Sequence, residues 1–173
     1  MRHLRFFIFS ALLCVQSLAL SREKEISFLD VTMVALAPIE SDGMSIWTYL
    51  PSGEDEHRWS SQLTVYSMDG LDFPSFRKDM EKTFVKLADL LPAVQYDAKS
   101  TESMLADYVM RSSSGEAAEH VAMHCFQSQS GKVVIVDLRR RAYSDHESFL
   151  ADIKSSRDAF IARFAKCAST IKE

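Results

Sequence analysis

The stretch from Met104 to Tyr143 constrains the fold more than any other part of the chain, because its pattern is typical of three consecutive β-strands. Two short segments rich in serine interrupt it, at residues 112–115 and 128–131, and each ends in a glycine. Both consist of residues that tolerate the backbone geometry of tight turns. The stretch therefore predicts a strand meander, which is a local antiparallel sheet, and it leads directly into a helical pattern.

Two segments carry apolar residues at the three- and four-residue spacing of an amphipathic helix. The first begins at Asp72, a favourable cap residue that is followed by Pro74, and it ends at Pro92. Its apolar stripe consists of Phe76, Met80, Phe84, Leu87 and Leu91. The second begins at Ser144–Glu147, which has the pattern of a capping box, and it ends near Cys167. Its apolar stripe consists of Phe149, Ile153, Phe160 and Phe164.

Three further strands are predicted before the first helix. Ile26–Pro38 alternates only partly, Ser45–Leu50 is rich in β-formers, and Trp59–Ser67 alternates between its two sides. Ala93–Tyr96 is either a short strand or a connection, and Glu40–Gly43 is predicted as a turn. Together the segments predict an α+β fold: an antiparallel sheet of about five to seven strands, with two amphipathic helices packed on one side.

Residues 1–21 have the composition of a signal peptide, and residues 22–173 are expected to form a single α+β domain. A retained membrane anchor is the alternative, but the apolar run has 15 residues, whereas a spanning helix needs about 20. Cys14 raises the question of lipid attachment, yet Leu13 before it is bulky where a lipoprotein signal has a small residue. We expect a periplasmic or extracellular protein with no membrane span in the mature chain.

The charge of the mature chain argues against general nucleic-acid binding. Cleavage after residue 21 removes two of the 20 basic residues and none of the 24 acidic ones, which leaves a formal charge of −6. Nucleic-acid-binding domains usually carry a basic surface. We therefore expect a partner that is an unknown protein or an envelope ligand.

Two cysteines remain after signal cleavage, and an even pair in an oxidising compartment most simply forms a disulfide. Cys125 lies in the middle strand of the meander and Cys167 at the end of the last helix. Closing that loop stabilises a fold by roughly 4 kcal/mol on the chain-entropy account. The alternative is a redox pair, but the two cysteines lack the close Cys-x-x-Cys spacing of such sites.

One resemblance rests on short strings and on the order of the elements. The strings are Tyr49–Glu54, Trp59 and Leu63–Val65, followed by a helix, a meander with one cysteine and a final helix with the other. They resemble a group of uncharacterised bacterial exported proteins. The layout of residues 40–168 is also similar to the Mog1/PsbP-like superfamily of small α+β domains. That resemblance implies a binding or accessory role and no shared catalytic residues.

His120 and His124 are the clearest candidates in the sequence for a metal or catalytic site. On a helix they would face the same way and could share a metal, as in a metal-dependent hydrolase. On a strand, residues four apart are separated by about 13 Å, which is too far for one ion. Glu119 also precedes the first histidine, unlike the His-Glu-x-x-His order. We expect two half-exposed sheet histidines and no cofactor, with the hydrolase as the alternative.

The run Arg139–Arg141 suggests an anion site, because guanidinium groups bind carboxylates and phosphates with two hydrogen bonds. Strand alternation sends Arg139 and Arg141 to one face of the sheet and Arg140 to the other, which divides the patch. An anionic-lipid or cell-wall binder through Arg139 and Arg141 is one interpretation. A solvated strand end, paired with some of the acidic residues, is the other.

Four aromatic residues suggest a groove for a sugar or a peptide, namely Trp47, Tyr49, Trp59 and Tyr66. Trp59 shares the alternation of Leu63 and Val65, so we expect it in the core. Tyr66 lies on the polar side of that strand and is the better surface candidate. No Gly-x-Ser-x-Gly elbow or phosphate-binding glycine loop occurs in the sequence. The leading expectation is an exported, non-catalytic binding or accessory domain of the bacterial envelope.

Overall fold

The computed structural model of the chain describes residues 25–90, 95–97, 101–111 and 115–171. The predicted signal peptide, residues 1–21, lies outside the described residues. Across the described segments, no helix has the length and hydrophobicity needed to cross a membrane.

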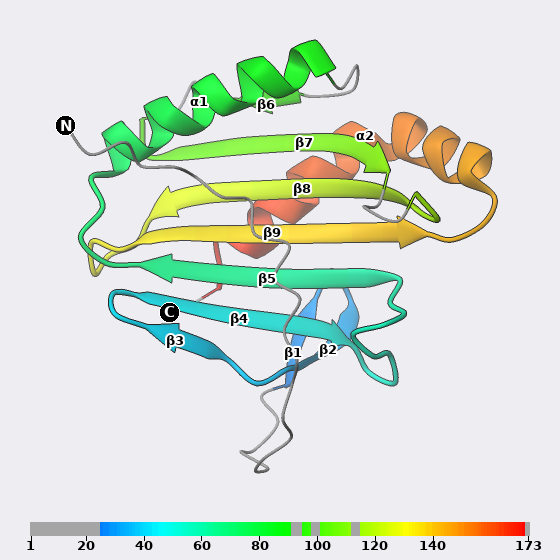
Figure 1. Cartoon of the computed structure of the whole chain (residues 1–173), viewed down its shortest axis with the longest axis horizontal. Helices are drawn as coiled ribbons and strands as arrows, with labels where there is room; N and C mark the ends of the chain where they lie inside the picture. The colour runs from blue at the N-terminus through cyan, green and yellow to red at the C-terminus, as the bar shows by residue number, and fades with distance from the viewer. Residues whose placement is uncertain (1–24, 91–94, 98–100, 112–114, 172–173) are drawn as a thin grey trace.

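In the described part of the chain, nine strands form one antiparallel sheet (Figure 1). The strands are β1 (Glu25–Phe28), β2 (Val31–Ala35), β3 (Ile39–Ser41), β4 (Met44–Pro51), β5 (Ser61–Met68), β6 (Gln95–Asp97), β7 (Ser103–Arg111), β8 (Ala118–Gln127) and β9 (Val133–Ala142). Their order is β1-β2-β4-β5-β9-β8-β7-β6, and β3 pairs with β4 outside this path. The sheet exceeds the expected five to seven strands because three strands, β1, β3 and β6, have only three or four residues.

The predicted meander is confirmed as β7, β8 and β9, which form the centre of the sheet together with β5. Cys125 of β8 lies opposite Met104 of β7 and Ile135 of β9. At the second turn, Gly131 has a φ of 90°, a backbone conformation that residues with a Cβ atom rarely adopt. Part of the first predicted turn, residues 112–114, lies outside the described residues.

The predicted strand Ile26–Pro38 is wrong, because this segment contains the β1–β2 hairpin. Leu29 and Asp30 connect the two strands and have φ values of 51° and 66°. Positive φ at both central residues is the geometry of a tight hairpin turn, which normally selects asparagine and glycine. Leucine rarely adopts that conformation, so the sequence carried no turn signal there. The turn predicted at Glu40–Gly43 is shorter than expected, because β3 takes up its first residues.

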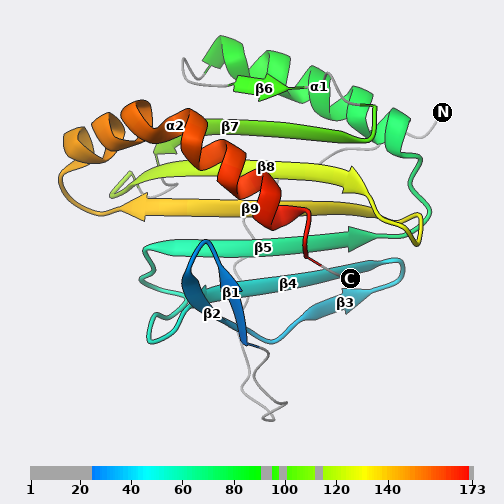
Figure 2. The same ribbon diagram turned by 180° about the vertical axis from the view of Figure 1, so that it is seen from behind.

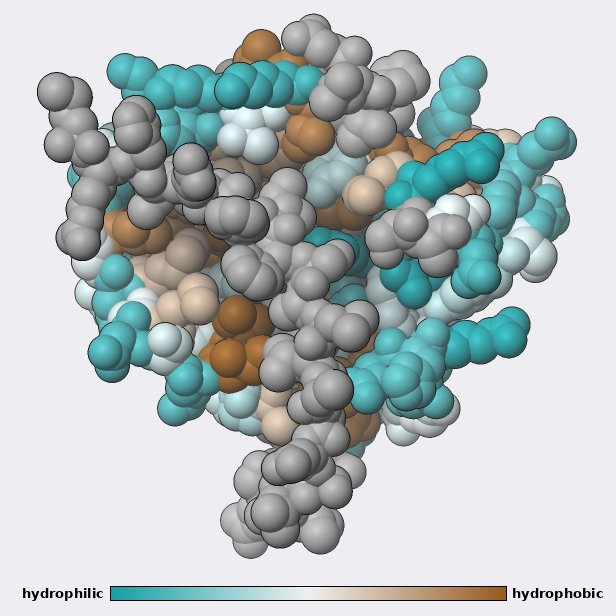
Figure 3. Space-filling model, viewed as in Figure 1, coloured by the Kyte–Doolittle hydropathy of each residue, from teal (hydrophilic) through white to brown (hydrophobic). Residues whose placement is uncertain are grey.

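The two helices pack on opposite faces of the sheet, which corrects the expectation of helices on one side. The helix α1 is Phe73–Leu90 and α2 is His146–Ala168. Figure 1 shows α2 behind the sheet, and Figure 2 shows it in front, whereas α1 follows the β6–β7 edge. Figure 3 shows hydrophilic side chains along the upper edge of the molecule, where α1 turns its other side to solvent.

Alternation of the central strands builds one core against each helix. The core on the α1 face consists of Phe73, Phe76, Phe84, Met104, Ala106, Cys125 and Val133. The core on the α2 face consists of Phe28, Met33, Tyr49, Leu63, Val65, Ala122, Val134, Val136, Leu138, Phe164 and Ala168. Because β8 and β9 contribute to both sets, these strands are covered on both sides, as the unbroken apolar run in β9 predicts.

The cap residue of α1 is the predicted one, and the cap residue of α2 is not. Asp72 accepts a hydrogen bond from the Ser75 amide at 3.0 Å, so the predicted cap of α1 is confirmed. In α2 the cap is Asp145 rather than Ser144, and its carboxylate accepts from the Ser148 amide at 3.3 Å. Asp145 has a φ of 51°, a left-handed turn that moves the helix start one residue along the chain.

The structure does not contain the predicted disulfide, and the two cysteines face opposite sides of the sheet. Cys125 is fully buried in the core on the α1 face. Cys167 lies in α2 and packs against the core on the α2 face. Both are free cysteines, and the sheet lies between them. The pairing was inferred from cysteine number and compartment, and neither signal reports the face to which a strand residue points.

Candidate functional site

A buried network of charged and polar side chains joins the sheet to α2. His120 of β8 has no exposed surface, and its Nε2 lies 3.0 Å from Oδ2 of Asp107 in β7. The Nε of Arg157 in α2 donates to the same carboxylate oxygen at 2.7 Å. On the other side of the ring, Nη2 of Arg140 in β9 lies 3.1 Å from Nδ1 of His120.

The donors and acceptors of this network assign the proton of His120. A guanidinium group only donates hydrogen bonds, so Nδ1 of His120 must accept from Arg140. The ring proton therefore resides on Nε2 and is donated to Asp107. Burial lowers the pKa of His120 below its usual value, and although Asp107 opposes that effect, the neutral ring is favoured.

The structure corrects the expectation that His120 and His124 are half-exposed. Both are buried, because α2 covers the face of β8 to which they point. His120 has both ring nitrogens engaged by protein groups, and Nδ1 of His124 has no hydrogen-bond partner within the described segments. Among the described residues, no group of three or more His, Cys, Asp or Glu side chains is placed to hold a metal ion.

Arg140 is held in place, but its charge is poorly neutralised. Its guanidinium lies 4.0 Å from the centroid of the Phe160 ring in α2. The nearest carboxylate, Oδ2 of the largely exposed Asp152, is 4.0 Å from Nη1, beyond hydrogen-bond distance. In the described part of the chain its buried Nε also finds no acceptor. Burial lowers the pKa of Arg140, and Asp152 only partly opposes this effect.

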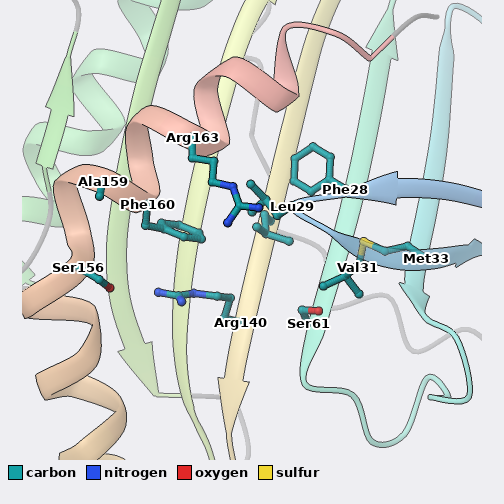
Figure 4. Close-up of a pocket in the computed structure, with 11 residues that line it drawn as sticks. Phe28, Leu29, Val31, Met33, Ser61, Arg140, Ser156, Ala159, Phe160 and Arg163 are labelled. Carbon is teal, nitrogen blue, oxygen red and sulfur yellow. The ribbon is translucent and has the colours of Figure 1, made fainter.

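Arg140 lines a pocket between the β1–β2 hairpin, α2 and the sheet, which we call the hairpin pocket (Figure 4). Its volume is about 410 Å³. The lining residues are Phe28, Leu29, Val31, Met33, Ser61, Leu138, Arg140, Ser156, Ala159, Phe160 and Arg163. Figure 4 shows Arg140 beneath Phe160 of α2, with Phe28, Val31 and Met33 of the hairpin across the hollow.

The second arginine of the hairpin pocket differs from Arg140 because it has a carboxylate partner. The Nη2 of Arg163 in α2 donates to Oδ2 of Asp30, which lies in the hairpin turn. Both side chains are more than half exposed, so the pair closes one rim of the pocket in contact with solvent. The remaining walls are largely apolar, and Val31 is exposed at 39%. The pocket thus combines an apolar hollow with one unbalanced cation.

A larger hollow of about 880 Å³ lies on the other side of α2, where Val109 of β7 and Gln95 of β6 form its walls. Its charged residues have both signs, with Lys154 and Asp158 close together in α2. The third, Arg157, is already engaged by Asp107. This hollow therefore lacks the unbalanced charge that distinguishes the hairpin pocket.

The predicted division of the arginine run is confirmed. Arg139 and Arg141 point to the α1 face, whereas Arg140 points to α2. Each of the first two has a buried carboxylate: Nε of Arg139 donates to Asp137 at 3.4 Å, and Nε of Arg141 donates to Glu119 at 3.0 Å. Neither arginine is therefore an unbalanced charge of the kind that an anion site needs.

The four aromatic residues do not line a common groove. Trp47 and Tyr49 pack into the core on the α2 face. Trp59 is buried as expected, but it lies under the guanidinium of Arg141, at 3.8 Å, instead of beside Leu63. Tyr66 is half-buried on the α1 face, and burial raises the pKa of its hydroxyl.

A model of an uncharacterised protein family matches residues 20–169. No curated protein and no solved structure matches the chain. The matched span contains every described strand and helix, from β1 to α2, and therefore all the residues of the hairpin pocket. The chain belongs to this uncharacterised family.

Proposed function

We propose that the protein is an exported, non-catalytic binding or accessory domain of the bacterial envelope, and that its ligand occupies the hairpin pocket. The signal-peptide pattern of residues 1–21 supports export. The resemblance of the layout to Mog1/PsbP-like domains supports a binding or accessory role. The observation that carries the proposal is the hairpin pocket itself.

The size and chemistry of the hairpin pocket support binding. Small-molecule sites typically have volumes of about 300–1,000 Å³ and apolar walls with a few polar groups. The hairpin pocket has about 410 Å³ and is lined by the side chains of β1, β2, β5, β9 and α2. It therefore lies where elements distant in the sequence meet, next to a hairpin that reaches over the sheet (Figure 2).

The chemistry around the pocket supports binding over catalysis. His120, the histidine in contact with Arg140, has both ring nitrogens engaged and is a poor general base. The Ser156 hydroxyl donates to the backbone carbonyl of Asp152 at 2.8 Å, which does not activate it as a nucleophile.

Binding of a neutral apolar fluorophore, N-phenyl-1-naphthylamine, to the purified protein tests the pocket. Ala159 is an exposed pocket-lining residue of α2, and Ala159→Trp would place an indole ring in the hollow. Ala159 also lines the larger hollow, so the matched control is Leu150→Trp, at an exposed residue of the same helix that lines the larger hollow and not the hairpin pocket. We expect Ala159→Trp to lose fluorophore binding and Leu150→Trp to keep it. Equal binding by both variants, or no binding by the natural protein, would refute the proposal.

A separate measurement tests export. Expression of the full chain in a Gram-negative host should give a soluble periplasmic form, whose N-terminus is found by sequencing. We expect it to start near residue 22. Retention of the uncleaved chain would contradict export while leaving the binding site untouched.

A further inference from the structure

We infer that the hairpin pocket binds an amphiphilic anion, whose carboxylate or similar head group lies on Arg140 and whose apolar chain lies between the β1–β2 hairpin and α2. This inference rests on the proposed function and names the class of ligand. It follows from three independent features of the site: the charge of Arg140, its fixed orientation and the apolar character of the walls.

The first feature is an unbalanced charge in a half-buried position. The carboxylate of Asp107 is engaged by His120 and Arg157, so it is not available to Arg140. The neighbouring Asp152 remains at 4.0 Å and is largely exposed to water. A half-buried cation without a close counter-charge is unfavourable, and an anion in the pocket would supply that charge.

The second feature is the fixed position of the guanidinium. His120 accepts from Nη2, and Phe160 covers the guanidinium plane at 4.0 Å. A neutral imidazole accepts a hydrogen bond without cancelling the positive charge. Arg140 has five N–H donors. One donor on Nη2 binds His120, and the Nε donor is buried, so the other donors of the guanidinium remain for a ligand. A small head group with two oxygens fits such an arrangement.

The third feature is the composition of the walls. Phe28, Val31 and Met33 of the hairpin line the pocket, and so does Leu138 of the sheet. Val31 is 39% exposed, an unfavourable state for a branched apolar side chain that a ligand would relieve. An inorganic anion would satisfy Arg140 but leave the exposed side chain of Val31 uncovered, whereas Phe28, Met33 and Leu138 are already buried in the core. A neutral hydrocarbon would cover the walls but leave Arg140 unbalanced, so the site favours a molecule with both parts.

Competition against N-phenyl-1-naphthylamine tests the inference with decanoate, decanol and acetate as probes, each below its aggregation concentration. We expect decanoate to compete about tenfold more strongly than decanol, because one charge-assisted hydrogen bond increases affinity by about that factor. Acetate should not compete at the same concentration. In Arg140→Gln, decanoate should fall to the level of decanol, whereas Arg140→Lys should keep part of the preference.

Two control variants locate the head group and the chain. Arg163 lines the same pocket but is paired with Asp30, so Arg163→Gln should change the decanoate preference less than about threefold, a small effect for an exposed pair. Ala159→Trp should abolish competition by decanoate, because it fills the hollow. Loss of preference in Arg163→Gln but not in Arg140→Gln would overturn the assignment.

The outcomes separate failure of this inference from failure of the proposed function. If decanol competes as well as decanoate, the pocket binds ligands and the anionic head group is refuted. If neither competes and the fluorophore does not bind, the proposed function itself fails. Sedimentation with phosphatidylglycerol vesicles, in a protein that does not bind monomeric decanoate, would also overturn the inference, because it would show a membrane surface as the ligand.

Discussion

Side chains that are far apart in the chain decide the chemistry of the α2 face. His120 is 13 residues and Arg157 is 50 residues from Asp107 in the sequence. Both nevertheless bind the same carboxylate oxygen of Asp107. Alternation within β9 predicted that Arg140 points away from Arg139 and Arg141. It carried no information about the partner that lies on the other face. A pair of this kind becomes visible only when the register of the strands is known.

Burial of two histidines predicts that the protein is less stable in acid. The pKa of His120 and of His124 is lowered, chiefly by desolvation. The unfolded chain therefore binds more protons than the folded protein between the lowered pKa and the ordinary value of about 6.5. The stability contributed by these groups should be complete above about pH 6.5. It should fall as the solution is acidified below that value, by at most about 1.4 kcal/mol per pH unit for each histidine.

The variant His124→Leu isolates the contribution of one histidine. The buried Nδ1 of His124 has no partner within the described segments, so leucine removes an unpaired polar atom. Urea unfolding at pH 7.5 and at pH 5 should show a smaller loss of stability in the variant than in the natural protein. An equal loss in both proteins would show that His124 does not contribute to the pH dependence.

Asp137 should have the opposite pH dependence. It is buried on the α1 face, and burial raises its pKa, although Arg139 opposes this effect. The folded protein then holds the proton more strongly than the unfolded chain, so stability from this group is present below about pH 4 and is lost as the pH rises. Asp137→Asn should therefore gain stability relative to the natural protein as the pH rises from 4 to 7.5.

The pH dependence of that gain is the check on its cause. In urea unfolding, the advantage of Asp137→Asn should shrink towards zero at pH 4. The exposed Asp158→Asn serves as the control for a general charge effect. A destabilised Asp137→Asn variant at pH 7.5 would mean that the ion pair with Arg139 outweighs the cost of burial.

At the scale of elements, the sequence predicted the helices and strands whose apolar residues recur at regular spacing. Both amphipathic helices and the three strands of the meander are confirmed, because each repeats its apolar pattern over nine or more residues. The β1–β2 hairpin was missed because Leu29, the first of its two turn residues, is not a typical turn residue. The hairpin forms one wall of the hairpin pocket, so the pocket itself was not predictable. Arg157 lies four residues after Ile153 and three before Phe160 of the apolar stripe of α2, a position that favours a buried polar contact.

The start of α2 gives a prediction at this scale. Asp145 caps the helix from a left-handed conformation, which asparagine tolerates and alanine does not. Asp145→Ala should lower the free energy of unfolding by about 1–2 kcal/mol, whereas Asp145→Asn should change it by a few tenths. If Ser144→Ala is the more costly change in denaturant unfolding, the cap is Ser144, as the capping-box pattern suggested.

At the scale of the whole molecule, the sheet lies between the two helices and separates the core on the α1 face from the core on the α2 face. The order and periodicity of the segments predicted the α+β class, but no pattern in the sequence states which face each helix covers. The placement of Cys125 against α1 and of Cys167 in α2 follows from that arrangement. In this arrangement the structure keeps apart the two cysteines that cysteine counting predicted as a pair.

Thiol labelling tests the arrangement of the two faces. Cys125 is fully buried, and burial raises the pKa of its thiol, whereas Cys167 is partly exposed. In the folded protein of residues 22–173, which lacks Cys14, a maleimide reagent should label Cys167 alone, and Cys125 should react only after unfolding. Two thiols that remain unlabelled in denaturant until a reductant is added would establish the disulfide and contradict the topology.

The central claim is that the hairpin pocket takes an anionic head group on Arg140 and an apolar chain against the β1–β2 hairpin. A crystal structure of the protein with decanoate measures this directly. We expect the carboxylate within hydrogen-bond distance of Arg140, with the chain between Val31 and Phe160. Decanoate bound at another place, or a hairpin pocket that stays empty at saturating decanoate, would contradict the claim.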